Sequence, residues 1–413
     1  MKAEIISIGD ELLIGQVVNT NASWMAVELN LAGINVVQIS SVSDEGEHIQ
    51  NALQEAETRA DVVLLTGGLG PTKDDITKKV MMDYFGSKPK FHEPTYQHIK
   101  NLFSKRSYPL SEVNRLQAYL PDNCTILPNR VGTAAGMWFE KNDTIFVSMP
   151  GVPFEMKTLI WEQVIPNLKK RFKTPFIYHK TIMTTGIGES MLAEKIEKWE
   201  SGLPDNIKLA YLPQPGIVRL RLSAEGFDED KTKTQVDEQC ELLKNYVPKA
   251  IFGYNDISLE ETLANILKEK GLTLATAESC TGGYISHLIT SIAGSSEFFM
   301  GSVVSYSNEA KMNLLSVNKN VIENYGAVSK EVVEKMAVGA REKFNTDYAI
   351  STSGIAGPDG GTEEKPVGTV WIGIATKKGV QSKLFHFGEH RGRNIRRSAL
   401  MALNLLRLEV LGL

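Results

Sequence analysis

The sequence is poor in cysteine and histidine, the residues from which zinc sites and disulfide frameworks are built. Its 413 residues include three cysteines and seven histidines, and no two cysteines form a C-x-x-C pair. This pattern excludes a disulfide scaffold and gives no support to a cysteine zinc site. Because the thiols are few, odd in number and widely separated, a reducing compartment fits best, and we expect a cytoplasmic location.

Long hydrophobic runs and an excess of one charge are also missing. No uninterrupted stretch of about 18 apolar residues is present, so we expect no membrane span. The first residues, MKAEIISIGDELL, resemble a strand and lack the regions of a signal peptide. The formal net charge is only −4, which leaves no electrostatic footprint of general nucleic-acid binding. A nucleic-acid partner is therefore not indicated.

The chain is long enough for two or three domains, since a domain typically has about 100–200 residues. In residues 1–172, the apolar runs AEIISIG and ADVVLLTGG flank a helical stretch that ends at Gly33, a plausible C-cap. Alternation of strand and helix predicts a mostly parallel sheet that is covered on both faces. Ligands of such folds collect at the carboxyl ends of the strands.

Residues 175–250 are different in character. The runs FIYHKTIMTTG and GIVRLRLSAEG predict strands, and helical patterns fall near residues 188–200 and 229–246. This segment predicts a compact α+β module that joins two larger domains.

A second α/β domain is expected over residues 255–413. Ser258 and Glu261 form the pattern of a capping box before a helix. Strand-like runs then recur, separated by helical patterns, at 272–278, 301–306, 347–353 and 369–375. The predicted fold class is therefore α/β, with two α/β domains and a small α+β module between them.

The stretch TAESCTGG places two potential nucleophiles, Ser279 and Cys280, where a predicted strand turns into a helix. The backbone N–H groups of such a turn can face a developing negative charge, and Gly282 and Gly283 allow close approach of a ligand. The alternative is that Ser279 and Thr281 only cap the helix. The turn by itself does not decide between these interpretations.

Later segments favour chemistry at this turn. Tyr306 and Lys311 follow another strand-like run, and a partly desolvated lysine can act as the base for a serine, although most lysines are solvated. The glycine-rich stretch STSGIAGPDGGTEEKPVGT is too long for a simple connection. Arginines cluster in HRGRNIRR, either on a solvated face or as a phosphate anchor.

Together, TAESCTGG, SYSNEAK, GAVS and SGIAGPDGGTEEKPVGTVW closely resemble the C-terminal domain of the CinA family, the nicotinamide-nucleotide amidohydrolases of the PncC type. The resemblance implies hydrolysis of nicotinamide mononucleotide to nicotinate mononucleotide and ammonia, without a cofactor. It implies that Ser279 is the nucleophile, Lys311 its base and Tyr306 an assisting group. The substrate-binding residues that we predict are Thr281, Gly282, Gly283, Ser353, Gly354, Gly357, Gly361, Arg391 and Arg393. The family's late glycine–aspartate–arginine motif is replaced here by GEHRGR, so the choice between Arg391 and Arg393 as phosphate ligand stays open.

The first segment carries a second candidate site. TGGLGPTKDD combines glycines with Asp74 and Asp75, and GDELL adds Asp10 at another predicted strand end. Oxygen ligands with few histidines suit Mg²⁺ or a similar divalent metal that is bound together with phosphates. The alternative for the aspartate pair is a solvated helix N-terminus.

IGDELLIGQVVNTN, TGGLGPTKDD, NRVGTAAGMWF and MPGVPFEM resemble the N-terminal domain of the CinA family, which shares the MoaB/MogA-type fold of molybdopterin-binding proteins. The resemblance implies metal-dependent cleavage of ADP-ribose to AMP and ribose 5-phosphate. Besides Asp74 and Asp75, the residues that it implies for this site are Asn19, Gly67, Gly68, Gly70, Asn129 and Glu155. The middle segment resembles the family's KH-like module.

The leading hypothesis is thus a bifunctional hydrolase of pyridine nucleotide recycling, acting on nicotinamide mononucleotide and ADP-ribose and forming a homodimer. In the alternative, the N-terminal domain is a non-catalytic nucleotide- or pterin-binding module within a competence or DNA-repair assembly. A molybdopterin-pathway enzyme is a third possibility, supported by fold analogy alone.

Overall fold

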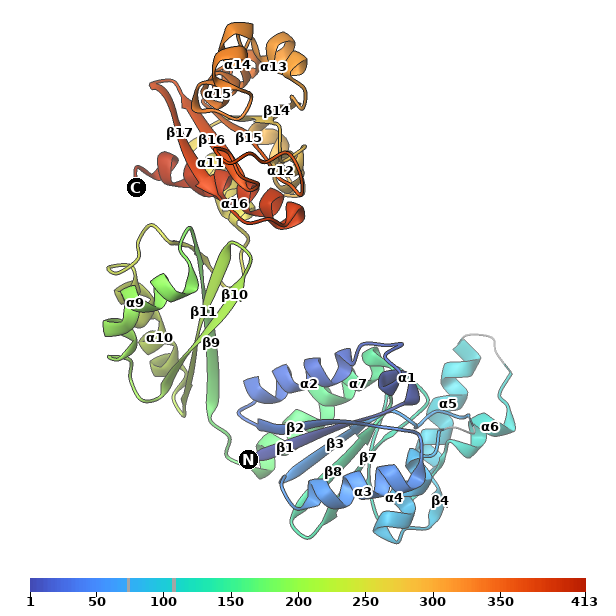
Figure 1. Ribbon diagram of the computed structural model, residues 1–413. Coiled ribbons are helices and arrows are strands. Elements are labelled where there is room, and N and C mark those ends of the chain that lie inside the picture. Colours follow the sequence, from blue (N-terminus) through green and yellow to red (C-terminus); the bar gives the residue numbers. More distant parts are fainter. Residues whose placement is uncertain (73–74, 106–108) are drawn as a thin grey trace. The chain divides into compact units, whose positions relative to one another are not determined.

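The computed structural model describes residues 1–72, 75–105 and 109–413 (Figure 1). The chain forms two compact units, residues 1–178 with 225–232 and residues 179–224 with 233–413. Within the described residues, none of the helices has the length and apolar composition needed to cross a membrane.

The N-terminal domain is a mixed sheet with helices along both faces. Its elements are β1 (Lys2–Ile8), α1 (Asp10–Leu13), α2 (Thr20–Leu31), β2 (Asn35–Val42), α3 (Gly46–Glu57), β3 (Val62–Thr66), α4 (Thr77–Phe85), β4 (Pro89–Phe91), α5 (Glu93–Lys105), α6 (Glu112–Leu116), β5 (Tyr119–Pro121), β6 (Thr125–Leu127), β7 (Gly136–Lys141), β8 (Thr144–Met149), α7 (Pro153–Leu159), the π-helical turn Ile160–Val164 and α8 (Ile165–Arg171). Gly33 follows α2 with φ of 76°, as a helix-ending glycine should.

The six strands of the main sheet have the order β2-β1-β3-β8-β7-β6. β2, β1, β3 and β8 run parallel, whereas β7 pairs antiparallel with both β8 and β6. The prediction of a mostly parallel sheet is confirmed for these four strands. The exception arises because Asn142 and Asp143, with φ of 48° and 65°, form a two-residue turn that sends β8 directly back along β7.

Alternate side chains of the central strands pack into two separate hydrophobic cores, one on each face of the sheet. Ile5 and Leu64 pack into the cluster that contains α2 residues such as Met25. Their neighbours Ile6 and Leu65 point to the opposite face and pack in the other cluster, with residues from α3 and α4. A parallel strand buried on both faces reads as a continuous apolar run, which is why these strands were predictable.

The middle module contains a four-stranded sheet with the order β10-β11-β9-β12. Its elements are β9 (Phe176–Thr185), α9 (Glu189–Glu200), β10 (Ile207–Gln214), β11 (Ile217–Gly226), α10 (Glu229–Leu243) and β12 (Ile251–Tyr254). The two predicted strands and two predicted helices are present, and the predicted α+β character of this segment is confirmed.

The C-terminal domain has its own five-stranded sheet. Its elements are α11 (Leu259–Lys270), β13 (Leu274–Glu278), α12 (Tyr284–Thr290), the 3₁₀ turn Ser295–Glu297, β14 (Phe299–Val304), α13 (Asn308–Leu315), α14 (Lys319–Tyr325), α15 (Lys330–Phe344), β15 (Tyr348–Gly354), β16 (Thr369–Thr376), β17 (Gly379–His386) and α16 (Arg391–Leu411). Ser258 caps α11 through a hydrogen bond from Glu261 N to its hydroxyl.

This sheet has the order β14-β13-β15-β16-β17. β14, β13 and β15 are parallel. β16 pairs antiparallel with β15, and β17 pairs antiparallel with β16. The four predicted strands are all found, whereas β17 was missed. It is an edge strand without a fully buried residue, so it lacks the apolar pattern on which strand prediction depends.

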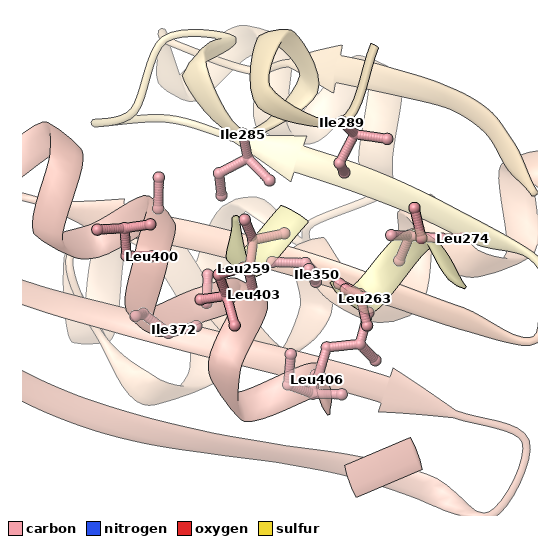
Figure 2. Close-up of a cluster of buried hydrophobic side chains, with 14 of the residues drawn as sticks. Leu259, Leu263, Leu274, Ile285, Ile289, Ile350, Ile372, Leu400, Leu403 and Leu406 are labelled. Atoms are coloured by element: carbon pink, nitrogen blue, oxygen red, sulfur yellow. The ribbon is translucent and has the colours of Figure 1, made fainter. Parts of the chain in front are cut away.

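Helices cover both faces of this sheet. Leu274 and Ile350 face one cluster, and their neighbours Ala275 and Ala349 face another, beneath α15. Figure 2 shows the first cluster, in which side chains of α11, α12 and α16 meet the sheet: Leu259, Leu263, Ile285, Ile289, Leu400, Leu403 and Leu406 around Leu274, Ile350 and Ile372. The α/β fold predicted for both large domains is therefore confirmed.

We predict that Leu403→Ala lowers the free energy of unfolding of the C-terminal domain by about 2–5 kcal/mol, because it leaves a cavity in this cluster. Leu314→Ala on α13 is the matched control, since Leu314 is 43% exposed, and it should change stability by less than about 0.5 kcal/mol. Denaturant-dependent hydrogen exchange of the β13 and β15 peptides measures both. Equal losses in the two variants would contradict the assignment of the core.

Candidate active site

Three parallel strands of the C-terminal sheet end side by side. Ser279 follows β13, and its N–H donates to Thr352 O on β15 at 3.0 Å. On the other side of β13, Ser305 follows β14 and its N–H donates to Glu278 O at 2.8 Å. The register of the sheet thus brings segments that are far apart in sequence to one edge, at the carboxyl ends of the strands.

Lys311 reaches this edge from α13. Its side chain is almost fully buried, with 1% exposure. Its Nζ atom lies 3.1 Å from Ser279 Oγ, 2.8 Å from Ser305 O and 3.3 Å from Tyr306 O. The predicted nucleophile and the predicted base are therefore in hydrogen-bond contact, which is the geometry that an activated serine needs.

The three contacts of Lys311 Nζ occupy all the bonding positions of the amine. A neutral amine has two N–H hydrogens and one lone pair. The carbonyls of Ser305 and Tyr306 can only accept, so they take the two hydrogens. An ammonium group would donate its third hydrogen to Ser279 Oγ, whereas the uncharged amine keeps a lone pair there, to which the Ser279 hydroxyl can donate. In this arrangement the amine is already placed to remove the proton of Ser279.

The surroundings of Lys311 favour this uncharged form. Burial lowers the pKa of the Lys311 amine below its ordinary value, and nearby Cys280 opposes this effect. Within the described parts of the chain, no carboxylate lies within ion-pair distance of Nζ, which would otherwise stabilise the ammonium form. A lysine whose pKa is lowered in this way can act as a general base.

Cys280, the second potential nucleophile of the turn, points into the core. It is 7% exposed and belongs to the hydrophobic cluster beneath α16. Burial raises the pKa of its thiol to about 12. Because the thiolate is the reactive form of cysteine, this thiol is a poor nucleophile. The geometry therefore favours Ser279 as the nucleophile.

The turn after Ser279 has the backbone of an anion-binding loop. Gly282 and Gly283 adopt φ of 61° and 96°, which disfavour other residues. In the described structure, the N–H groups of Cys280 and Thr281 have no protein acceptor. Such unpaired amides next to a nucleophile are candidates for an oxyanion hole. The capping alternative does not hold for Ser279, because α12 is capped at Gly283 without a side-chain hydrogen bond from Ser279.

The other predicted pocket residues of this domain, Ser353, Gly354 and Gly361, are engaged in packing and hydrogen bonds around the site. Ser353 is buried and donates its hydroxyl to Ala327 O at 2.7 Å, so this hydroxyl is already used. Gly354 is packed so tightly that an added Cβ would lie 2.6 Å from Val370. Gly361 likewise lies against the backbone of the following residues of its loop. We conclude that these residues frame the site and offer no reactive group to it.

The two candidate arginines differ in their surroundings. Arg391 Nη1 donates to Gly357 O at 2.9 Å, and Nη2 lies 3.3 Å from the Tyr306 hydroxyl. For the Arg393 guanidinium, no partner is present among the described residues. Tyr306 contacts Lys311 through its carbonyl, whereas its side chain is 62% exposed. The phenol lies with Arg391 and makes no hydrogen bond to Lys311 or Ser279.

Two residues of this site were missed by the sequence analysis. Asn394 on α16 is 1% exposed and donates to Ala356 O at 3.0 Å and to Gly388 O at 2.7 Å, so it ties the glycine-rich loop to the helix. Glu278, directly before Ser279, is fully buried. Both lie within the quoted motifs, but a single sequence gives no sign that these polar side chains point inward.

In the N-terminal domain, β3 leads into the predicted glycine loop. Gly67 and Gly68 have φ of 117° and 64°. An added Cβ would lie 2.2 Å from Ile8 O at the first and 2.1 Å from Thr77 Oγ1 at the second. These positions therefore need glycine because the loop approaches the neighbouring strand and helix closely.

Asp75 lies over the same loop. Its Oδ2 atom accepts from Thr72 N at 2.9 Å and from the Thr72 hydroxyl. A Cβ at Gly70 would lie 2.4 Å from this oxygen, so the loop and the carboxylate are in contact. Asp74, the other predicted metal ligand of the pair, lies outside the described residues.

Asn19 and Asp10 are engaged in local structure. Asn19 caps α2 by accepting from Ala22 N at 3.1 Å, and its amide lies 3.3 Å from Ser41 Oγ. After the ends of β1 and β2, the Asp10 N–H donates to the Asp44 carboxylate at 3.1 Å, and the Asp44 N–H donates to the Asp10 carboxylate at 3.3 Å. These contacts account for both side chains without a ligand.

Asn129 and Glu155 form a pair of their own. Asn129 Nδ2 donates to Glu155 Oε2 at 2.7 Å, and its Oδ1 atom accepts from Val131 N and Gly132 N. Glu155 lies so close to Gly132 that a Cβ there would be 2.0 Å from its carboxylate. The pair therefore holds the loop between β6 and β7.

A divalent metal needs several oxygen ligands at one point. Among the residues that the structure describes, no group of three or more histidine, cysteine, aspartate or glutamate side chains could hold a metal ion. Among the described residues, Asp75 has a carboxylate in contact with the glycine loop. A single carboxylate does not make a metal site.

Comparison with known proteins agrees with this architecture. Residues 4–170 match the family described as "Probable molybdopterin binding domain", residues 179–253 the "Damage-inducible protein CinA KH domain" and residues 256–410 the "CinA C-terminal domain". The chain is 48% identical to a CinA-like protein of Flavobacterium psychrophilum, over 100% of this chain and 99% of that protein. A CinA-like protein of Cytophaga hutchinsonii is 46% identical over 99% of this chain and 98% of its own length. The chain belongs to the CinA family.

We predict that a fluorophosphonate probe reacts with Ser279 at a rate that rises with pH. Lys311 must be uncharged to accept the proton, so the rate should reach its plateau at a pH below the ordinary lysine pKa, because burial lowers the pKa of this amine. Lys311→Met should abolish the reaction, whereas Lys319→Met on exposed α14 should leave it unchanged. Quantitative mass spectrometry of the labelled peptide measures the rate. A flat pH profile would contradict the assigned base.

Proposed function

We propose that the C-terminal domain hydrolyses the carboxamide of nicotinamide mononucleotide, giving nicotinate mononucleotide and ammonia. The observation that carries the chemical part of this proposal is the contact of 3.1 Å between Lys311 Nζ and Ser279 Oγ, in a site where the amine donates to two carbonyls. The choice of substrate rests on the family resemblance of the motifs that surround these residues.

In the first half of the proposed reaction, Ser279 Oγ attacks the carboxamide carbon while Lys311 takes the hydroxyl proton. The carbonyl oxygen becomes an oxyanion, for which the amides of Cys280 and Thr281 are available donors. Lys311 then gives its proton to the departing nitrogen. The carbon–nitrogen bond breaks, ammonia leaves and an ester forms on Ser279.

In the second half, a water molecule attacks the ester. Lys311 takes a proton from the water and passes it to Ser279 Oγ as the ester bond breaks. The products are a free carboxylic acid and the original serine. One water is consumed for each ammonia released, and Lys311 returns to its uncharged state after every cycle.

The substrate phosphate needs a cation at the mouth of the site. Arg391 is tied to Gly357 O and lies beside the Tyr306 phenol, so we assign it to holding the glycine-rich loop. Arg393 lies two residues further on, in the first turn of α16, and has the freer guanidinium. We therefore propose Arg393 as the phosphate ligand, with the exposed Tyr306 side chain lining the entrance.

For the N-terminal domain we propose cleavage of ADP-ribose to AMP and ribose 5-phosphate with a divalent metal. The supporting observation is the contact between the glycine loop and Asp75, since such a loop admits a phosphate next to an oxygen ligand. We derive no step through the metal, because the described carboxylates do not complete its site. The competing proposal for this domain is a nucleotide- or pterin-binding module without catalysis.

We predict that Ser279→Ala lowers ammonia release from nicotinamide mononucleotide by at least about 10³-fold, because it removes the nucleophile. Cys280→Ala, its neighbour in the same turn, should retain most of the activity, since its thiol is buried in the core. A coupled ammonia assay on the full chain measures both. Robust release by the Ser279→Ala protein would contradict the serine mechanism.

We predict that AMP formation from ADP-ribose needs an added divalent metal and falls by at least about 10²-fold in Asp75→Asn. Asp10→Asn is the matched control, because Asp10 is held by Asp44 and lies on a different loop. Chromatography of the products with and without a chelator tests this. Binding of ADP-ribose without cleavage at any metal concentration would favour the non-catalytic module.

A further inference from the structure

Glu278, the last residue of β13, carries a carboxylate that is fully buried directly before Ser279. Its two oxygens accept five hydrogen bonds. Oε2 accepts from the Thr281 hydroxyl at 2.7 Å and from the amides of Gly283 and Ile285 at 3.0 Å each. Oε1 accepts from the amide of Ser286 at 2.8 Å and from the Ser286 hydroxyl. All five donors lie in the turn after Ser279 or in the first turn of α12.

The donors require both oxygens to be acceptors. Each oxygen faces at least one backbone N–H, and an N–H cannot reverse its role. A glutamine would direct an NH₂ group at one of these amides. Buried donors without an acceptor are costly, by about 1–3 kcal/mol each. Both oxygens of Glu278 therefore serve as acceptors for the turn, a pattern that glutamine cannot reproduce.

This carboxylate divides the amides of the turn into two sets. Those of Gly283, Ile285 and Ser286 are bound by Glu278. The amides of Cys280 and Thr281 keep no protein acceptor in the described structure. The positive end of α12 is thus neutralised by the protein's own charge, and the two amides next to the nucleophile stay free.

We propose that Glu278 is a positioning residue for the reaction of Ser279. Its charge fixes the path of residues 279–283 so that the amides of Cys280 and Thr281 form the oxyanion site. The proposal rests on the proposed amidohydrolase function only in that Ser279 is the nucleophile, because it does not depend on which amide is the substrate. Glu278 acts through the backbone of the turn and does not touch the reacting atoms.

The same residue also connects the turn to the base. Its carbonyl accepts from Ser305 N at 2.8 Å. Ser305 in turn presents its own carbonyl to Lys311 Nζ. The side chain of Glu278 therefore orders the oxyanion donors, while its backbone orders the residue that holds the base. A disturbance at this one position should reach both halves of the site.

The test is the rate at which a fluorophosphonate probe labels Ser279 in the full chain. The probe's phosphoryl oxygen needs the same amides as a tetrahedral intermediate, whatever the natural substrate is. We expect Glu278→Gln to slow labelling by about 10²-fold, comparable to the loss of one oxyanion donor. The matched control is Glu4→Gln, which removes the charge of another fully buried carboxylate, held by Ser40 and Arg59 in the N-terminal domain. Its labelling rate should be unchanged.

A second variant separates positioning from folding. Glu278→Asp keeps the charge near α12 but withdraws it from the turn by one methylene, and we expect an intermediate rate. Hydrogen exchange of the β13 and β15 peptides reports whether the Glu278 variants retain the fold. With nicotinamide mononucleotide as substrate, we expect kcat of these variants to fall while KM stays within about threefold of its value in the unchanged protein.

Normal labelling by a folded Glu278→Gln or Glu278→Asp protein overturns the proposal. Loss of the native exchange pattern in both variants also overturns it, because the carboxylate would then serve folding alone. Absence of labelling in the unchanged protein refutes the serine nucleophile itself, and this inference with it. If labelling depends on Glu278 but the protein has no activity on nicotinamide mononucleotide, the positioning role of Glu278 is supported and only the proposed substrate is refuted.

Discussion

The C-terminal site depends on the hydrogen bond between the buried amine of Lys311 and the hydroxyl of Ser279. A buried ammonium needs a counter-charge, and the described surroundings of this amine provide two neutral carbonyls instead. Burial lowers the pKa of the amine and so favours its uncharged, basic form. The two carbonyls accept its N–H groups and hold Nζ beside Ser279 Oγ.

The parallel sheet makes this contact possible. β14, β13 and β15 end at one edge, so the carbonyls that hold Lys311 and the hydroxyl that it contacts come from different connections of the chain. Glu278 then directs the first amides of α12 away from the site, and Arg391 ties the glycine-rich loop to α16. The side chains of Glu278 and Arg391 both bind backbone groups, and these contacts give the site a rigid frame.

The sequence predicted the elements with strong patterns. Strands buried on both faces appear as apolar runs, and the nucleophile turn, the base and the glycine loops lie where such runs end. The exposed edge strand β17 has no such pattern. The inward turn of Glu278 and Asn394, and the use of the Tyr306 carbonyl rather than its phenol, depend on how distant segments pack, which spacing along one chain does not encode. In the N-terminal domain, Asn19, Asp10 and Asp75 fall on separate local hydrogen-bond networks for the same reason.

The most direct test of this account is a nitrogen-15 NMR titration of Lys311 Nζ in the full chain, with its signal assigned by comparison with Lys311→Arg. The account predicts an amine that titrates below the ordinary lysine pKa and is uncharged at the pH at which Ser279 reacts. A signal that remains that of an ammonium up to the ordinary lysine pKa would contradict it, because Lys311 could then not accept the serine proton.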